Sequence, residues 1–312
     1  MKLFLLGKGG SVTHWLEDAA AAFAAEGHEV VVGLVRRPWL AAKVESALVS
    51  PIAASIRRRI ANHQPDLILV IGAFHAPREI LETIASLPGR PPIVGWVGDV
   101  FAQDVAGIAD VYDAVGYTDT ALLSRHQAWG LKATAVYLPH AANPFGAWPS
   151  RARRLPRMAF VANPTPFRRE LVAGIASQVS LYGPGWSRKD GSHHRIHGRR
   201  TAPGTLRGIY GAHLAALNIR NEYNVVAGLN QRNFDPLLAG AALLTEDQPD
   251  LERCFDPGIE VLVWRDIETL NAQYARLLAD PAAASDLAQR GRRRVLAEHT
   301  FGARLKTLAG FL

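Results

Sequence analysis

The N-terminal stretch that decides the fold reads LFLLGKGGSVTHWLEDAAAAFAAEGHEVVVGLV, residues 3–35. Its first residues, 3–7, form a continuous apolar run that ends at glycine, which predicts a short buried strand followed by a tight loop. Residues 13–26 are rich in alanine with apolar side chains at helical spacing, Gly27 ends this segment, and residues 28–35 read as a strand again. A strand, a helix and a second strand in this order predict parallel strands joined by a right-handed crossover.

The same alternation continues through the first half of the chain. Further strands are predicted at 65–73, 91–99, 113–118 and 133–138. Helices are predicted at about 39–63, 77–86 and 124–129. This series predicts an N-terminal Rossmann-like domain over residues 1–145. Residues 140–157 are rich in proline, alanine and arginine without periodicity, and we interpret them as an interdomain linker.

A second alternating series follows the linker. Strands are predicted at 157–163, 179–183, 214–220, 241–246 and 259–264. Helices are predicted at 168–177, 205–212, 231–238, 250–255, 267–279 and 281–298, and a long polar loop before about residue 203. This series predicts a C-terminal Rossmann-like domain over residues 155–298. Residues 299–312 are expected to form a last helix that packs back on the N-terminal domain.

The predicted fold class is therefore α/β, with two Rossmann-like domains that face each other across a cleft. Ligands of open α/β sheets bind outside the carboxyl ends of the strands. We therefore expect the functional residues to lie at strand ends that line this cleft.

Composition limits the class of protein further. Hydrophobic residues make up 48% of the 312 residues and charged residues 20%, which is ordinary for a globular chain. Cys254 is the only cysteine, which excludes a disulfide framework within the chain and a cysteine-rich zinc site. The apolar run at the N-terminus is too short for a signal peptide, and no run reaches the roughly 18 residues of a membrane span. We expect a cytoplasmic protein whose only membrane contact would be peripheral.

Positive charge is concentrated in the middle of the chain. The net charge is +7, and residues 151–207 hold twelve Lys or Arg against two acids, Glu170 and Asp190. Such an excess favours an anionic partner, although a solvated arginine-rich surface is an equally good interpretation for most of these residues. No nucleic-acid-binding signature accompanies the basic segment, so we do not expect a nucleic-acid partner.

Three motifs near the C-terminus carry a resemblance to a known family. They read RNFDPLLAGAALLTED at 232–247, LERCFDPGIEV at 251–261 and GRRRVLAEHT at 291–300. Together they resemble the C-terminal domain of CgeB-like (spore-protein type) group 1 glycosyltransferases. Weaker matches extend the resemblance, and they are YLPHAANP at 137–144, VANPTPFRRELV at 161–172 and YGPGW at 182–186.

The resemblance implies a GT-B fold and an enzyme that moves a sugar from a nucleotide-diphosphate sugar to an acceptor hydroxyl. GT-B enzymes usually work without a catalytic metal, so we expect neither a metal nor a cofactor besides the donor substrate. The acceptor could be a carbohydrate, a lipid-linked molecule, a protein or a small molecule. The oligomeric state stays open.

The resemblance also implies which residues bind the donor. Asp235 matches the acidic position of the motif, where related families bind the ribose diol, and the alternative is an acid favoured by the helix dipole. Guanidinium groups suit diphosphate oxygens, and the alternative is surface solvation or pairing with a carboxylate. The diphosphate candidates are Arg168, Arg169, Arg220 and Arg232, with Arg168 preferred. The other donor-side candidates are Asn163, Gly183, Asn233, Gly9 and Gly10.

One position departs from the wider retaining families. They carry a second glutamate eight residues before the acidic position, often in contact with the donor sugar, and this chain has Ala227 there. Glu222 and Asn224 lie nearby but out of register. The departure leaves the donor sugar and the stereochemistry open, with retention slightly preferred over inversion.

Transfer with inversion needs a base that deprotonates the acceptor hydroxyl. Asp99, at the end of a predicted strand, is the first candidate, and His14 after the glycine loop is the second. His75 and His140 are candidates for positioning the acceptor, although a lone histidine at a strand end is more often structural. In a retaining mechanism none of the four would act as a base.

Two alternatives remain beside the sugar transferase. The first is a catalytically silent protein of the same fold that binds a sugar nucleotide or a glycan. The second, a nicotinamide oxidoreductase, is disfavoured because Thr13 stands where the dinucleotide fingerprint needs its last glycine. The cluster of His193, His194 and His197 has no cysteine or carboxylate beside it, so we expect a mobile polar loop there instead of a metal site.

Overall fold

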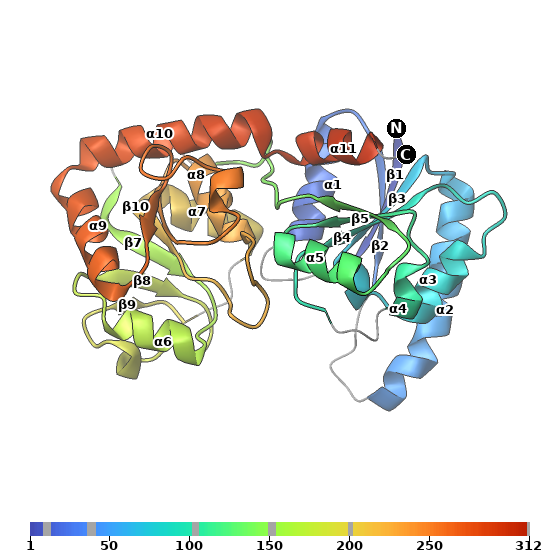
Figure 1. The fold of residues 1–312 in the computed structure, drawn as a ribbon, viewed down its shortest axis with the longest axis horizontal. Helices are drawn as coiled ribbons and strands as arrows, with labels where there is room; N and C mark the ends of the chain where they lie inside the picture. The colour runs from blue at the N-terminus through green and yellow to red at the C-terminus, as the bar shows by residue number, and fades with distance from the viewer. Residues whose placement is uncertain (9–13, 36–41, 102–105, 149–153, 199–201, 311–312) are drawn as a thin grey trace. The chain divides into compact units, whose positions relative to one another are not determined.

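A computed structural model describes the chain except residues 9–13, 36–41, 102–105, 149–153, 199–201 and 311–312 (Figure 1). The chain divides into two compact units. The N-terminal unit comprises Met1–Pro139 and the C-terminal stretch from Phe301, and the C-terminal unit comprises His140–Thr300. Within the described residues, no helix is long and apolar enough to cross a membrane.

The N-terminal unit has a parallel sheet whose described strands run in the order β2-β1-β3-β4-β5-β6. The strands are β1 (Lys2–Gly7), β2 (Glu29–Leu34), β3 (Leu67–Ile71), β4 (Ile93–Val97), β5 (Ala114–Tyr117) and β6 (Thr134–Tyr137). The helices are α1 (Trp15–Ala25), α2 (Ala42–His63), η1 (Ala73–His75), α3 (Arg78–Ala85), α4 (Ala106–Ala109) and α5 (Thr120–Ala128). Figure 1 shows α1 on one side of this sheet and α2 with α3 on the other.

Continuous apolar runs form the central strands because both faces of this sheet are covered. Every residue of β3 and of β4 is buried. In register, Leu5 of β1 faces Val32 of β2 and Leu69 of β3. The buried side chains of the strands thereby build one apolar core with the helices on either side.

The last helix, α11 (Phe301–Ala309), belongs to the N-terminal unit. Phe301 packs edge-on against Phe23 of α1 and Trp96 of β4, with ring centroids 6.1 and 6.0 Å apart. Arg304 Nε donates a 2.7 Å hydrogen bond to the carbonyl oxygen of Pro139. The C-terminal end of the chain therefore helps to close the core that the first half of the chain begins.

The C-terminal unit has a second parallel sheet, with described strands in the order β12-β11-β10-β7-β8-β9. The strands are β7 (Leu155–Val161), β8 (Val179–Tyr182), β9 (Arg195–Ile196), β10 (His213–Asn218), β11 (Ala242–Glu246) and β12 (Leu262–Trp264). The helices are α6 (Pro166–Ala173), η3 (Arg188–Asp190), α7 (Pro203–Ala212), η4 (Gln231–Asn233), α8 (Asp235–Leu238), η5 (Leu251–Arg253), α9 (Ile267–Ala279) and α10 (Pro281–Glu298). The predicted pair of Rossmann-like folds is therefore confirmed.

Several helices of the C-terminal unit begin at residues whose side chains cap them. Thr165 accepts a hydrogen bond from the backbone N–H of Arg168, and proline follows it at the first turn of α6. Asp266 and Thr269 form a reciprocal capping box at the start of α9. α9 begins at the predicted residue, whereas α6 begins at Pro166, two residues before its predicted start, because Thr165 and the proline set the first turn there.

Three predicted elements differ in the structure. The helix predicted at 250–255 is only the 3-10 turn η5. The segment expected as a long polar loop contains η3 and the edge strand β9, and His194 within it is buried, with Nε2 2.8 Å from the carbonyl oxygen of Val172. The helix predicted at 231–238 is instead the 3-10 turn η4 followed by the short helix α8. In the latter two places side-chain hydrogen bonds to the backbone help to determine the conformation. The spacing of apolar residues in the sequence does not indicate such bonds.

Gly183 follows β8 at a place where no other residue fits. Its φ is +127°, and a Cβ there would lie 2.3 Å from the carbonyl oxygen of Ala162. We expect Gly183→Ala to lower the free energy of unfolding of the C-terminal unit by roughly 3 kcal/mol, because backbone strain and overlap act together. Denaturant unfolding would measure the loss. Gly208→Ala in α7 is the control, since a Cβ there meets nothing within 4 Å and alanine favours a helix. Equal stability of the two variants would contradict the prediction.

Candidate functional site

The strand order places a topological switch point at the centre of the C-terminal sheet. From β7 the chain moves outward to β8 and β9, and from β10 it moves the other way to β11 and β12. Loops that leave β7 and β10 therefore diverge at the carboxyl edge of the sheet. Ligands of open α/β sheets bind at such points.

Arg168, the preferred diphosphate candidate, lies at this switch point and bridges the ends of β7 and β10. Its Nη1 donates to the carbonyl oxygen of Asn163, 2.9 Å away, just after β7. Its Nε and Nη2 donate to the carbonyl oxygen of Ile219, at 3.2 and 2.9 Å, and Nε also donates to that of Arg220. The Arg168 side chain therefore links the ends of β7 and β10 by hydrogen bonds, an arrangement called the Arg168 clamp below. It also puts a positive charge where the diphosphate of the donor was expected to bind.

The cation at Arg168 is held in an unusual environment. The residue is 3% exposed, and burial lowers the pKa of its guanidinium to about 9, with the nearby Arg232 acting in the same direction. Glu222 and Glu246 oppose this effect on the pKa. The group keeps its proton at neutral pH, so a desolvated positive charge with a second guanidinium nearby lies at the switch point. An anion bound there would relieve the repulsion between Arg168 and Arg232.

Acids and amides at the same edge were missing from the predicted donor-binding set. Glu246, at the end of β11, forms an ion pair with Arg220 Nη1 and accepts the backbone N–H of Arg220 at 3.2 Å. Burial raises the pKa of Glu246 even though Arg220 acts against it. Glu222 accepts a 3.0 Å hydrogen bond from Thr165 Oγ1. Gln248 is 4% exposed, and its amide atoms have no hydrogen-bond partner among the described residues.

A buried amide network lies beneath this edge. Asn218 Nδ2 donates to Asn233 Oδ1 at 3.0 Å and to Thr245 Oγ1 at 3.1 Å, and Asn230 Nδ2 donates to Asn218 Oδ1 at 3.0 Å. Asn233, predicted on the donor side, is fully buried, and its Nδ2 donates to Thr245 Oγ1 at 2.8 Å. The network ties the end of β10 to η4 and β11, and Asn233 supports the site from below.

Asp235 begins α8 and is 4% exposed. Gln231 Nε2 donates to its Oδ1 at 2.9 Å and to the carbonyl oxygen of Ala141 at 2.6 Å. Asp235 raises and Arg232 lowers the pKa of the buried Tyr210, so both charges act on the Tyr210 hydroxyl. The charge of Arg232 also acts on Arg168, so the three charged groups belong to one electrostatic neighbourhood.

The other donor-side candidates are placed differently. Arg169 forms an ion pair with the buried Asp190, and its Nη2 donates to the carbonyl oxygen of Gly185 at 2.8 Å. It is therefore directed toward η3, whereas Arg168 bridges β7 and β10. Asn163 is exposed at the end of β7, and Gly183 is buried beside Ala162. Gly9 and Gly10 lie outside the described residues.

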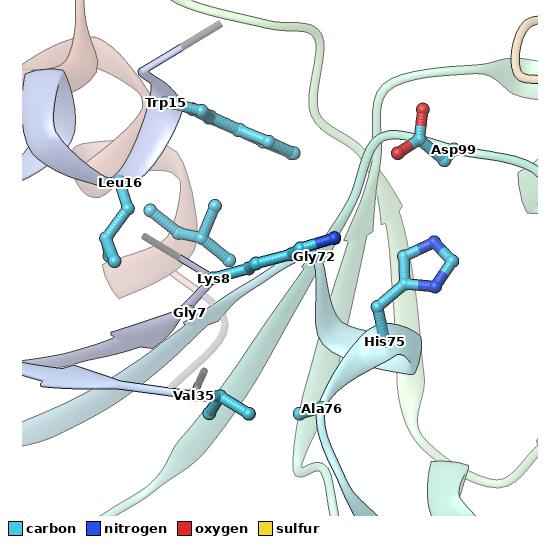
Figure 2. Close-up of a pocket in the computed structure, with 10 residues that line it drawn as sticks. Gly7, Lys8, Trp15, Leu16, Val35, Gly72, His75, Ala76 and Asp99 are labelled. Atoms are coloured by element: carbon cyan, nitrogen blue, oxygen red, sulfur yellow. The ribbon is translucent and has the colours of Figure 1, made fainter. Parts of the chain in front are cut away.

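The N-terminal sheet has its own switch point, between β1 and β3, and a cavity lies there. Its volume is about 290 Å³, and it is reached by the carboxyl ends of β1, β3 and β4. Figure 2 shows its lining, which is Gly7, Lys8, Trp15, Leu16, Val35, Ile71, Gly72, His75, Ala76 and Asp99.

This cavity brings two of the acceptor-side candidates together. Asp99, just after β4, is half-buried, and His75, at the end of η1, is exposed. His14 is the buried N-cap of α1 with a left-handed φ of 49°, and the described lining of the cavity does not include it. His140 is buried in the C-terminal unit. Lys8 and Trp15 line the same cavity, and sequence reasoning did not single them out as site residues.

Over the part of the chain that the structure describes, no group of three His, Cys, Asp or Glu side chains is arranged to hold a metal ion. The rings of His193 and His194 lie with their centroids 3.9 Å apart and tilted by 48°, and each ring forms a hydrogen bond with a backbone carbonyl oxygen. Independence from a metal stays a prediction.

The chain resembles glycosyltransferases in a family match and in overall structure. Residues 165–310 match the model of a family described as glycosyl transferase-like. HepE of Anabaena, solved in complex with UDP and glucose, has a TM-score of 0.69 and 13% identity over 99% of this chain and 98% of HepE. Sucrose-phosphate synthase of Thermosynechococcus elongatus has the same TM-score, identity and coverage. AviGT4, a glycosyltransferase of avilamycin A biosynthesis, has a TM-score of 0.64 and 13% identity over 100% of this chain and 97% of its own. No curated protein sequence matches the chain.

These likenesses define the class of fold. The chain has the GT-B fold of two Rossmann-like domains along its whole length. The stretch that matches the glycosyl transferase-like family includes Arg168, Arg232 and Asp235, together with the amide network below them.

Proposed function

We propose that the chain is a glycosyltransferase of the CgeB-like group, which moves a sugar from a nucleoside-diphosphate sugar to an acceptor hydroxyl. The observation that carries the proposal is the cluster of Arg168, Arg232 and Asp235 near the switch point of the C-terminal sheet. It lies within the stretch that matches the glycosyl transferase-like family. HepE, whose fold is similar, was solved with UDP and with UDP-glucose, which supports a nucleotide sugar as donor.

The donor fits the chemistry of this cluster. A departing diphosphate needs positive charge, and Arg168 and Arg232 supply it without a metal ion in our proposal. Arg168 and Arg232 repel each other, and a bound diphosphate would offset this repulsion. Asp235, whose carboxylate accepts a hydrogen bond from Gln231, would accept the ribose hydroxyl hydrogens.

The acceptor would bind in the N-terminal unit. Asp99 and His75 line a cavity at the carboxyl ends of β3 and β4. A residue that acts as a base or positions the acceptor must line such a cavity, and Asp99 does. In an inverting reaction Asp99 would take the proton of the acceptor hydroxyl. In a retaining reaction, which we prefer slightly, it would hold the hydroxyl by a hydrogen bond.

A thermal-shift series with nucleoside diphosphates tests the donor site. At 100 times its Kd, the correct diphosphate stabilises the native state by about 2.7 kcal/mol. We expect the unfolding midpoint of the C-terminal unit to rise by roughly 5–10 °C. The matching nucleoside without phosphates is the control and should shift the midpoint by less than about 1 °C, because it lacks the charge that the arginines bind. The proposal fails if no diphosphate of any common base raises the midpoint.

A further inference from the structure

The lining of the cavity in the N-terminal unit combines apolar and polar side chains. The apolar ones are Trp15, Leu16, Val35, Ile71 and Ala76, and all five are buried. The polar ones are Lys8, His75 and Asp99, near the ends of β1, η1 and β4. An occupant must therefore offer both apolar surface and polar groups.

Lys8 gives the lining of the cavity a positive charge. It is exposed, it follows directly after β1, and the structure gives its amino group no ion pair with any described residue. Figure 2 shows the Lys8 side chain extended along the cavity, with its amino group directed toward the side where Asp99 and His75 lie. The lysine ammonium group is a point charge that can bind an anionic group of a ligand.

The volume limits how large the occupant can be. The cavity measures about 290 Å³, which is at the lower end for pockets that hold a small organic ligand. One small molecule, or one terminal unit of a larger one, fills such a space. A polymer would have to insert a single unit.

We propose that the acceptor is a small hydroxylated acid, whose carboxylate or phosphate pairs with Lys8. Its apolar surface packs against Trp15 and Val35, and its hydroxyl faces Asp99 and His75. This inference rests on the proposed function for the fate of the hydroxyl, whereas the binding of the acid stands on the cavity alone.

Binding is tested by isothermal calorimetry on the whole chain with matched probes. The pairs are 4-hydroxybenzoate against 4-hydroxybenzyl alcohol, and glucose 6-phosphate and glucuronate against glucose, which separate carboxylate from phosphate. We expect at least one acid to bind about tenfold more tightly than its neutral partner. Lys8→Gln should remove this preference and change binding of the neutral partner less than about twofold. Lys8→Arg should keep most of the preference, since the charge remains.

Lys132→Gln is the control, because Lys132 is an exposed lysine of the same unit that does not line the cavity and forms a 3.7 Å ion pair with Asp110. The inference is overturned if acid and neutral partner bind equally, or if Lys8→Gln weakens both to the same extent. It is also overturned if none of the acids binds while donor hydrolysis proceeds, and the proposed function then survives. Acid binding that depends on Lys8, without release of nucleoside diphosphate from any donor, would instead remove the proposed function and leave the cavity site.

Discussion

Asp235→Asn is expected to reduce the release of nucleoside diphosphate from the correct sugar donor about 100-fold. The amide cannot accept two ribose hydrogens as the carboxylate can, and hydrogen bonds to a charged group contribute about 1.5–3 kcal/mol each. The substitution keeps the volume of the side chain and leaves Oδ1 as acceptor for Gln231 Nε2. Turnover is measured by coupled detection of the diphosphate, and affinity for the diphosphate by calorimetry.

Asp280→Asn provides the control for this experiment. Asp280 is also an acid at a helix start of the C-terminal unit, where it caps α10 through the backbone N–H of Ala283. If Asp235 were only favoured by the helix dipole, both variants would lose a little stability and neither would lose turnover. Diphosphate binding without any turnover in the unmodified chain would favour the silent binder over the enzyme.

Arg168→Met is expected to lower the free energy of unfolding of the C-terminal unit by about 3 kcal/mol. The substitution leaves the carbonyl oxygens of Asn163, Ile219 and Arg220 without the guanidinium that binds them. Buried acceptors that lose their donor cost about 1–3 kcal/mol each, and local rearrangement recovers part of this. The unfolding midpoint should fall by roughly 6–12 °C, as calorimetry would measure.

Two further variants separate the structural role of Arg168 from its charge. Arg168→Lys should recover only a small part of the stability, because an ammonium group cannot reproduce the planar fork that reaches both strand ends. Arg265→Met is the matched surface control, since Arg265 is exposed and pairs with Asp247 at 2.7 Å, and it should cost less than about 1 kcal/mol. An Arg168→Met protein that is as stable as the unmodified chain but binds no diphosphate would show that the clamp contributes nothing to stability.

The central strands could be predicted from the sequence because their residues are buried on both faces. The run around Leu67–Ile71 and that around Ile93–Val97 are apolar throughout, as parallel strands covered by helices require. The edge strand β9 is two residues long and contains Arg195, so no apolar run marked it. Its neighbourhood is held instead by the buried ring of His194, a contact that depends on where α6 and β8 lie.

The candidate site was only partly predictable for a related reason. The motif around Asp235 and the basic pair at Arg168 and Arg169 mark a stretch of chain, but they do not say where each side chain is directed. The structure directs Arg168 to the ends of β7 and β10 and Arg169 to Asp190, although the two residues are neighbours in sequence. Residues three or four apart share a helix face, whereas adjacent residues diverge by about 100°.

The sequence by itself determined two alternating series of apolar strands and helices, because local periodicity and the burial of strand faces are properties of short segments. The tertiary structure alone decided that Lys8, His75 and Asp99 line one cavity and that Arg168 joins the ends of β7 and β10, since those contacts depend on strand order. Strand order arises from the packing of whole crossover units, and no single stretch of sequence encodes it.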